Sequence, residues 1–260
     1  MVLLRPAASG FEVFLVRRHD NVAFMGGAHV FPGGRVDEAD RWLGESAAFQ
    51  VAALRELFEE AGILLAMRAA GPIRFSDGAE SARFLEYRAA LASGAMSMRE
   101  LVEREQITLA LDRLVWFAHW VTPEIETRRF DTRFFAAVAP EGQHAVHDAR
   151  ETTHGEWMAP GAAIERCRRD EIALPPPTWT TLRTLARFDS VDEVMLWARN
   201  RRVVRVQPGF IRTGSLTMLT LPGDPAYPPI DGFETPEETR FILDRGRWQP
   251  AAAGPSDTGE

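Results

Sequence analysis

The chain lacks lysine altogether: all 30 of its basic residues are arginine. This absence excludes a P-loop lysine, a Schiff-base lysine and a lysine nucleophile. Acidic residues outnumber basic ones, and the formal net charge of −7 argues against broad nucleic-acid binding, which requires a basic surface. An anionic substrate would therefore need a metal ion or a local cluster of arginines.

Cysteine is almost absent as well, because Cys167 is the only one in 260 residues. The chain therefore has no internal disulfide and no zinc or iron–sulfur site built from cysteines. Long apolar runs are also missing: the N-terminal run ends at Arg5, and none approaches the length of a membrane span. We expect a cytoplasmic globular protein that binds neither nucleic acid nor a membrane.

Hydrophobic patterning predicts a mixed α/β fold. Alternation of apolar residues predicts a strand over residues 10–18, and a short strand with a tight turn is expected over 29–34. Ser46 is a suitable N-cap for a helix that ends at Gly62, which suits the C′ position. A further strand is expected over 63–67. This strand, turn, helix and strand would open a mixed sheet.

The rest of the chain divides into an insertion, a second set of strands and helices, and a tail. Residues 72 to about 113 have helical periodicity and predict a helical insertion whose helices begin near Asp77 and Ser97. Further strands are expected over 114–122, 128–140, 155–160, 201–208, 215–223 and 238–246, and further helices over 160–170, 174–188 and 190–200. We expect a single domain over residues 1–245 and a loose tail over 246–260.

The helix before Gly62 crowds three glutamates onto one side. At 100° per residue, Glu56, Glu59 and Glu60 fall within a stripe about 100° wide, and the opposite side is apolar. Like charges one turn apart repel by about 0.2–0.5 kcal/mol per pair. Two interpretations follow. The stripe is either a solvated acidic face or a magnesium or manganese site, since hard cations bind carboxylate oxygens and complete their shell with water and phosphates.

The stretch "GGRVDEADRWLGESAAFQVAALRELFEEAGI" resembles the Nudix box, a Gly-Gly turn followed by a glutamate-rich helix. The matching positions of its second half are Arg55, Glu56, Leu57, Glu59, Glu60, Gly62 and Ile63. The resemblance implies an α/β/α sandwich with a mixed sheet, here with a helical insertion and a C-terminal helical elaboration. It also implies hydrolysis of a nucleoside diphosphate linked to another moiety.

The spacing within this box is unusual. Twenty residues separate Gly34 from Arg55, where the usual pattern has thirteen. Counted back from the arginine, the first acidic position of the box falls on Ala47, with Glu45 two residues earlier. We interpret the additional residues as an insertion in the loop that enters the helix.

The resemblance also implies roles for individual residues. The metal ligands would be Glu56, Glu59, Glu60 and the carbonyl of Gly33. Arg55 would orient a carboxylate, and the bound Mg²⁺ or Mn²⁺ would neutralise the diphosphate and activate a water for in-line attack on phosphorus. The general base is either Glu151, in a segment that resembles the later acidic loop of the family, or Glu56. His147 and His154 near that loop are expected to be surface histidines.

Two further segments resemble the branch that includes the peroxisomal coenzyme A diphosphatases and their bacterial relatives: "VRRHDNVAFMGGAHVFPGG" and "WVTPEIETRRFDTRFF". This resemblance implies cleavage of coenzyme A or acyl-coenzyme A into 3′,5′-ADP and a phosphopantetheine. An acidic enzyme would need arginines near the metal to bind these phosphates, because guanidinium groups bind phosphate bidentately. The arginines expected to do so are Arg17, Arg18, Arg128 and Arg129.

Two other functions stay open from the sequence. One is a Nudix hydrolase for NADH, ADP-ribose or other nucleotide diphosphates. The other is a Nudix-fold binding module without catalysis, although such modules are expected to lose the box carboxylates, which are present here. The helices expected near residues 80–105 could cover the pantetheine arm, pack on the core or form the contact of a homodimer.

Overall fold

The computed structural model describes residues 1–21, 25–75, 78–125, 128–146 and 152–252. Its helices are the 3₁₀ helices η1 (Glu38–Leu43) and η2 (Leu111–Arg113) and the α-helices α1 (Ala48–Ala61), α2 (Gly78–Ala92), α3 (Met98–Glu105), α4 (Pro160–Arg168), α5 (Pro176–Leu185) and α6 (Val191–Asn200). Its strands are β1 (Val2–Pro6), β2 (Phe11–Arg18), β3 (His29–Val30), β4 (Ala66–Arg68), β5 (Gly71–Pro72), β6 (Thr108–Leu109), β7 (Val115–Val121), β8 (Asp131–Val138), β9 (Thr152–Met158), β10 (Arg205–Val206), β11 (Gly209–Thr213), β12 (Leu216–Thr220), β13 (Arg240–Asp244) and β14 (Arg247–Ala251).

The central sheet is mixed and contains seven strands. Its order is β10-β7-β8-β1-β2-β3, and β9 pairs with the other edge of β2. β1 is parallel to β8 and β10 is parallel to β7, whereas the remaining pairs are antiparallel. β3 pairs with β2 only at Val16 and Arg17, beyond the residues that pair with β1. The amino group of Met1 donates to the carbonyl of Pro32, so the turn after β3 lies beside the start of β1.

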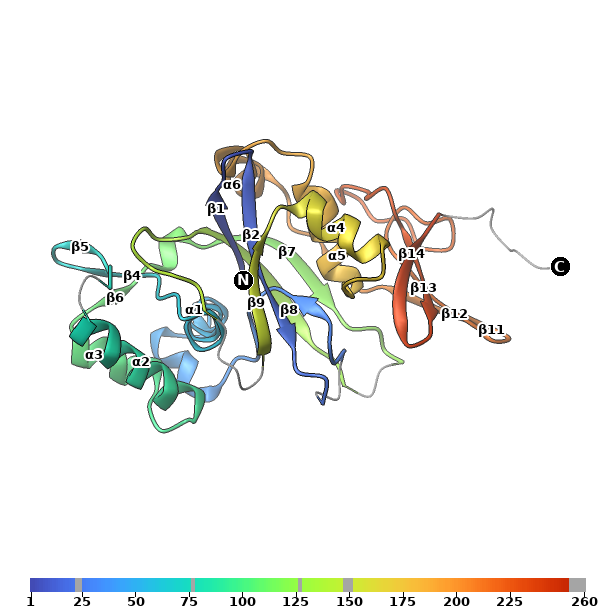
Figure 1. The fold of residues 1–260 in the computed structure, drawn as a ribbon. Coiled ribbons are helices and arrows are strands. Elements are labelled where there is room, and N and C mark those ends of the chain that lie inside the picture. Colours follow the sequence, from blue (N-terminus) through green and yellow to red (C-terminus); the bar gives the residue numbers. More distant parts are fainter. Residues whose placement is uncertain (22–24, 76–77, 126–127, 147–151, 253–260) are drawn as a thin grey trace.

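Helices cover both faces of this sheet (Figure 1). Alternate residues of β2 point to opposite faces, as the period of a strand requires. Val13 and Leu15 pack in a core with α4, α5 and α6, whereas Phe14 and Val16 pack in a second core with α1. The α/β/α sandwich implied by the sequence is therefore confirmed.

The predicted helical insertion is also confirmed, as α2 and α3. Ser97 caps α3 as expected: its hydroxyl accepts from the backbone N–H of Glu100, and the Glu100 carboxylate accepts from the backbone N–H of Ser97. α2 packs against α1 through Phe84, whose ring meets Phe58 edge-on at 6.4 Å. Asp77, expected near the start of α2, lies outside the described residues. The insertion therefore lies directly on the glutamate-rich helix.

A second sheet follows α6 and has the order β11-β12-β13-β14, with every pair antiparallel. The expectation of a loose chain from Gly246 is wrong for β14, which pairs along all five of its residues with β13. Pro250 lies within this strand. β14 tolerates it because an edge strand can spare one backbone donor.

Two local predictions around α1 are wrong. Ser46 does not cap α1, since the helix begins at Ala48 with Ala47 as its N-cap residue and with no side-chain cap. The chain instead enters the helix through consecutive turns, in which Ala47 donates to the carbonyl of Gly44. The strand expected over 63–67 is confined to β4, because the side chain of Gln143 satisfies both backbone groups of Leu64.

No helix in the described part of the chain is long and apolar enough to span a bilayer.

Candidate active site

Helix α1 fixes the candidate site by burying one face and ending at a glycine. Its apolar side contributes Val51, Leu54, Leu57 and Phe58 to the core, each at most 1% exposed. Gly62 adopts a left-handed conformation with φ of 70°, and its N–H donates to the carbonyl of Phe58. A residue with a side chain would be strained there. The glutamates therefore lie in the last two turns of a helix that is held on one side and closed at its end.

Arg55 is the centre of a buried charge network. It is 8% exposed, and its Nε and Nη2 atoms donate to the two carboxylate oxygens of Asp40 at 3.0 and 3.1 Å. Its Nη1 atom donates to Glu56 at 3.1 Å and to Glu59 at 3.3 Å, and Nη2 also donates to the carbonyl of Arg35. Burial alone would lower the pKa of this guanidinium, but hydrogen bonding to Asp40 and the nearby carboxylates raise the pKa well above its ordinary value. Arg55 therefore stays charged.

The three glutamates of α1 do not form a solvated acidic face. Glu60 is 7% exposed, and the side chains of Glu56 and Glu59 are each 13% exposed. The backbone N–H of Gly33 donates to Glu60 Oε2 at 2.8 Å, and a Cβ atom at Gly34 would overlap the Glu56 carboxylate. The Gly-Gly turn thus lets the backbone approach the carboxylates closely.

The site carries more negative charge than its cations neutralise. Burial raises the pKa of Glu59, and Arg55 opposes this effect. The amino group of Met1 also lies nearby, but its burial lowers its pKa to about 6, although Glu60 and Glu56 act in the opposite direction. That amine is then largely neutral near pH 7, and the single guanidinium of Arg55 is shared among the carboxylates of Asp40, Glu56 and Glu59. Such an excess favours the binding of a further cation.

The type of donor fits a hard divalent cation, since the excess charge resides on carboxylate oxygens. No three histidine, cysteine, aspartate or glutamate side chains in the described ranges are already arranged to enclose an ion. Their hydrogen bonds explain why the three carboxylates do not converge on one point. Arg55 holds Glu56 and Glu59, and the backbone N–H of Gly33 holds Glu60. The assignment of Glu56, Glu59, Glu60 and the Gly33 carbonyl as metal ligands stays a prediction.

Sequence reasoning missed Asp40, the main partner of Arg55. Asp40 is 1% exposed and lies in η1, where Asp37 and Asp40 form a reciprocal capping box. Glu45, the acidic residue closest to the expected position, instead pairs with Arg41 at the surface. The spacing counted back from Arg55 assigns the additional residues of the box to the stretch before its first acidic position. Counting forward from Gly34 reaches Asp40 after five intervening residues, so the insertion follows this position instead.

The four arginines predicted to bind substrate come from one end of the central sheet. β2 ends at Arg18 and β8 begins at Asp131, and these ends coincide because β1 is antiparallel to β2 and parallel to β8. Arg17 is already engaged, by Asp20 at 2.6 Å and Thr153 at 3.0 Å. Arg128 and Arg129 are both exposed, and Arg129 donates to the carbonyl of Thr122 and to the side-chain oxygen of Gln207.

Arg18 differs from the other three, because its Nε atom is buried and has no hydrogen-bond partner among the described residues. Two further candidates, the proposed base Glu151 and the nearby His147, lie outside the described residues. Glu56, the alternative base, lies in the Arg55 network. Both assignments of the base stay predictions.

Beside Arg17 the structure brings together a second charged cluster that the sequence did not reveal. Its centre is Glu156, which pairs with Arg166 at 2.9 Å. The Nε2 atoms of His29 and His154 each lie 3.7 Å from Glu156 Oε1. His29 is 5% exposed, and its burial lowers its pKa to about 4. His154 was expected at the surface, and its side chain is 56% exposed. These contacts depend on strand register, which residue spacing alone does not supply.

Comparison with known proteins agrees with this architecture. Residues 41–185, more than half of the chain, match the NUDT19 Nudix domain. The chain is 30% identical to the acyl-coenzyme A diphosphatase NUDT19 of Homo sapiens, over 93% of this chain and 80% of the human protein. It is 26% identical to the putative nudix hydrolase 7 of Caenorhabditis elegans, over 86% of this chain and 72% of that protein.

Among solved structures, a NUDIX hydrolase from Alicyclobacillus acidocaldarius superposes on the fold with a TM-score of 0.67 and 25% sequence identity. The match covers 75% of this chain and 92% of that one. The extent of the domain match and the identity to the human protein carry the assignment. The chain therefore belongs to the NUDT19 branch of the Nudix hydrolase family.

Proposed function

We propose that this protein is a divalent-metal-dependent Nudix hydrolase that cleaves the diphosphate of coenzyme A or acyl-coenzyme A. The products would be 3′,5′-ADP and phosphopantetheine or its acyl derivative. The observation that carries this proposal is the intact set of three largely buried glutamates on α1, in a chain of which 93% aligns at 30% identity with human acyl-coenzyme A diphosphatase. A binding module that had lost catalysis would be expected to lose some of these carboxylates, whereas all three are present.

In the proposed mechanism Glu56, Glu59 and Glu60 would hold Mg²⁺ or Mn²⁺, and the Gly33 carbonyl would be a further ligand. When bound, the metal ions neutralise the diphosphate and activate water for in-line attack on phosphorus. The chain supplies the positioning. Arg55 fixes the orientation of two of the glutamates through its Nη1 atom and is itself held by both oxygens of Asp40.

The arginines at the end of the sheet would bind the phosphates of the substrate. Coenzyme A carries a 3′-phosphate in addition to the diphosphate, so a protein with a net charge of −7 needs local positive charge. Arg18 is the best placed, because its Nε atom is buried without a partner among the described residues. Arg17 would have to exchange its contact with Asp20 for the substrate.

The direct test is identification of reaction products by mass spectrometry. The purified protein is incubated with Mg²⁺ or Mn²⁺ and an equimolar mixture of coenzyme A, acetyl-coenzyme A, NADH, ADP-ribose and dinucleoside polyphosphates. We expect 3′,5′-ADP together with phosphopantetheine or its acetyl derivative. The Glu60→Gln protein, purified in parallel, is the control for contaminating hydrolases and should leave the mixture intact.

Two outcomes would contradict the proposal at different levels. Formation of AMP from NADH or ADP-ribose, with coenzyme A intact, would retain the metal-dependent hydrolase and reject its substrate. An unchanged mixture with either metal, from protein that binds Mn²⁺ and unfolds cooperatively, would indicate a binding module instead.

A further inference from the structure

The helical insertion contacts the glutamate-rich helix at its C-terminal end through Arg88 of α2. Arg88 is 9% exposed, and its Nε atom donates to the backbone carbonyl of Glu59 at 2.9 Å. Its Nη2 atom donates to the carbonyl of Val146 at 2.7 Å. One guanidinium thus joins the last turn of α1 to a segment more than fifty residues further along the chain.

The last carbonyls of an α-helix have no partner within the helix, so they need other donors. At the end of α1, Gly62 donates to Phe58, Arg88 donates to Glu59, and Val146 donates to Ala61. Two of these donors come from outside the helix and the turn that ends it. A cation at this position also complements the negative end of the helix dipole.

The local sequence is adapted to this contact. A Cβ atom at Gly62 would lie 3.0 Å from Arg88 Nη1, so a side chain there would push against the guanidinium in addition to straining the backbone. Phe84, one helical turn before Arg88, packs edge-on against Phe58 of α1 and so fixes the approach of α2. Arg88 is therefore held by packing and is directed at the turn that carries Glu59 and Glu60.

We propose that Arg88 is a positioning residue, which fixes the last turn of α1 and thereby the carboxylates of Glu59 and Glu60 for metal binding. This inference rests on the proposed function for the identity of the metal site. It gives the helical insertion a role in the catalytic centre, beyond general packing or covering of the substrate.

The test compares Arg88→Met and Arg88→Lys with Arg83→Met. Methionine keeps an unbranched stem but removes the charge and both hydrogen bonds, whereas lysine keeps the charge and at most one bond to α1. Arg83 is the matched control, because it lies on the same helix, is exposed, and forms its hydrogen bonds with Glu105 and not with α1. Three quantities are measured: Mn²⁺ affinity by calorimetry, kcat and KM for acyl-coenzyme A, and amide hydrogen exchange of residues 58–66.

We expect Arg88→Met to weaken Mn²⁺ binding by about tenfold and to lower kcat by a similar factor, with KM for the substrate nearly unchanged. Exchange of residues 58–66 should accelerate, Arg88→Lys should recover part of each loss, and Arg83→Met should match the wild type. If Arg88→Met does not fold, Arg88→Lys carries the same test.

Unchanged Mn²⁺ affinity and kcat in folded Arg88 variants would overturn the inference, even if their melting temperature fell, because Arg88 would then only stabilise the fold. Failure of the proposed function appears differently. In that case the wild type itself would not cleave coenzyme A compounds, while the effect of Arg88 on Mn²⁺ affinity and on exchange could still be measured.

Discussion

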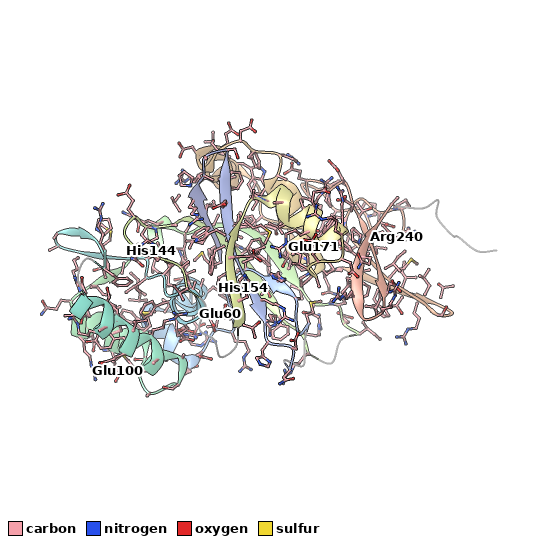
Figure 2. All side chains as sticks on the ribbon, viewed as in Figure 1. Glu60, Glu100, His144, His154, Glu171 and Arg240 are labelled. Carbon is pink, nitrogen blue, oxygen red and sulfur yellow. The ribbon has the colours of Figure 1, made fainter. Side chains whose placement is uncertain are left out.

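Two charged clusters lie on opposite faces of the central sheet and have opposite composition. On the α1 face one arginine, Arg55, contacts the carboxylates of Asp40 and of glutamates in its own helix. On the α4 face one carboxylate, Glu156, is surrounded by Arg166 and two histidines. Figure 2 labels one residue near each cluster: Glu60 on α1, next to Glu59, and His154 on β9.

The difference between the clusters indicates which of them needs a ligand. Glu156 has a charged partner in Arg166, and buried His29 is neutral near pH 7 because its pKa is lowered to about 4. That cluster is close to electrical balance. In the α1 cluster the one guanidinium of Arg55 is shared among the carboxylates of Asp40, Glu56 and Glu59, so this cluster gains more than the other from an added cation.

The largest expected effect is on the rate of hydrolysis, and it compares one carboxylate on each face of the sheet. Glu60→Gln should lower metal-dependent hydrolysis by about 1,000-fold, or about 4 kcal/mol, since it removes a charged carboxylate from the proposed metal site and keeps the shape of the side chain. Glu156→Gln, the same change on the other face, should leave turnover within about tenfold. Steady-state rates at saturating Mg²⁺ give both values. Equal losses in the two variants would mean that the catalytic carboxylates are not confined to α1.

The second effect concerns stability and compares two acidic residues before α1. Asp40→Asn should destabilise the fold by about 3 kcal/mol, because Arg55 is buried and loses its bidentate partner. Glu45→Gln should change stability by less than about 0.5 kcal/mol, as expected for an exposed pair. Urea denaturation followed by circular dichroism measures both. A larger loss for Glu45→Gln would reject Asp40 as the partner that organises the site.

Asp40 also shows how much of the site the sequence contained. The residues of α1 that carry charge were predictable, because helical period places them on one side and the box motif fixes their types. The partner of Arg55 was not identified, because the box contains additional residues and the count was made from one end only. An insertion leaves the sequence position of a partner ambiguous, whereas burial against Arg55 identifies it at once.

The secondary structure was also predictable where it depends on local sequence patterns, and it was missed where it depends on pairing with distant segments. Long periodic segments such as α2, α3, β7 and β8 were predicted, since their patterns are local. Strand β1 was not predicted from its five residues, and it forms because it inserts between β2 and β8. Likewise, the cluster around Glu156 depends on the register of β2 with β3 and β9, which arises from pairing between distant segments.

The third effect is on the pH dependence of stability, and it tests the cluster on the α4 face. The pKa of His29 is lowered in the folded protein to about 4, from 6.5 in the unfolded chain, so the unfolded chain binds more protons between these values. Stability should therefore fall as pH decreases from 6.5 to 4, with His29 contributing about 2 kcal/mol of the loss. The charged groups facing His29 are Glu156, Arg166, Arg17 and His154.

The measurement for His29 is the free energy of unfolding at pH 7 and at pH 4.5. His29→Gln should reduce the difference between the two values, whereas the exposed His144→Gln should not. An unaltered pH dependence in His29→Gln would mean that the imidazole is protonated within the cluster. The α4 face would then carry excess positive charge, and the contrast between the faces would sharpen.

The smallest effect concerns substrate affinity and separates two adjacent arginines of β2. Consecutive residues of a strand point to opposite faces, so Arg17 and Arg18 should report on different sides of the sheet. Arg18→Ala should raise KM for coenzyme A by about tenfold, because its guanidinium has an Nε atom without a hydrogen-bond partner among the described residues, and a bound phosphate would supply that partner. Arg17→Ala should raise KM less, since Asp20 and Thr153 already engage its guanidinium. Initial rates over a range of coenzyme A concentrations measure both, and a larger effect at Arg17 would place the phosphates on the α4 face.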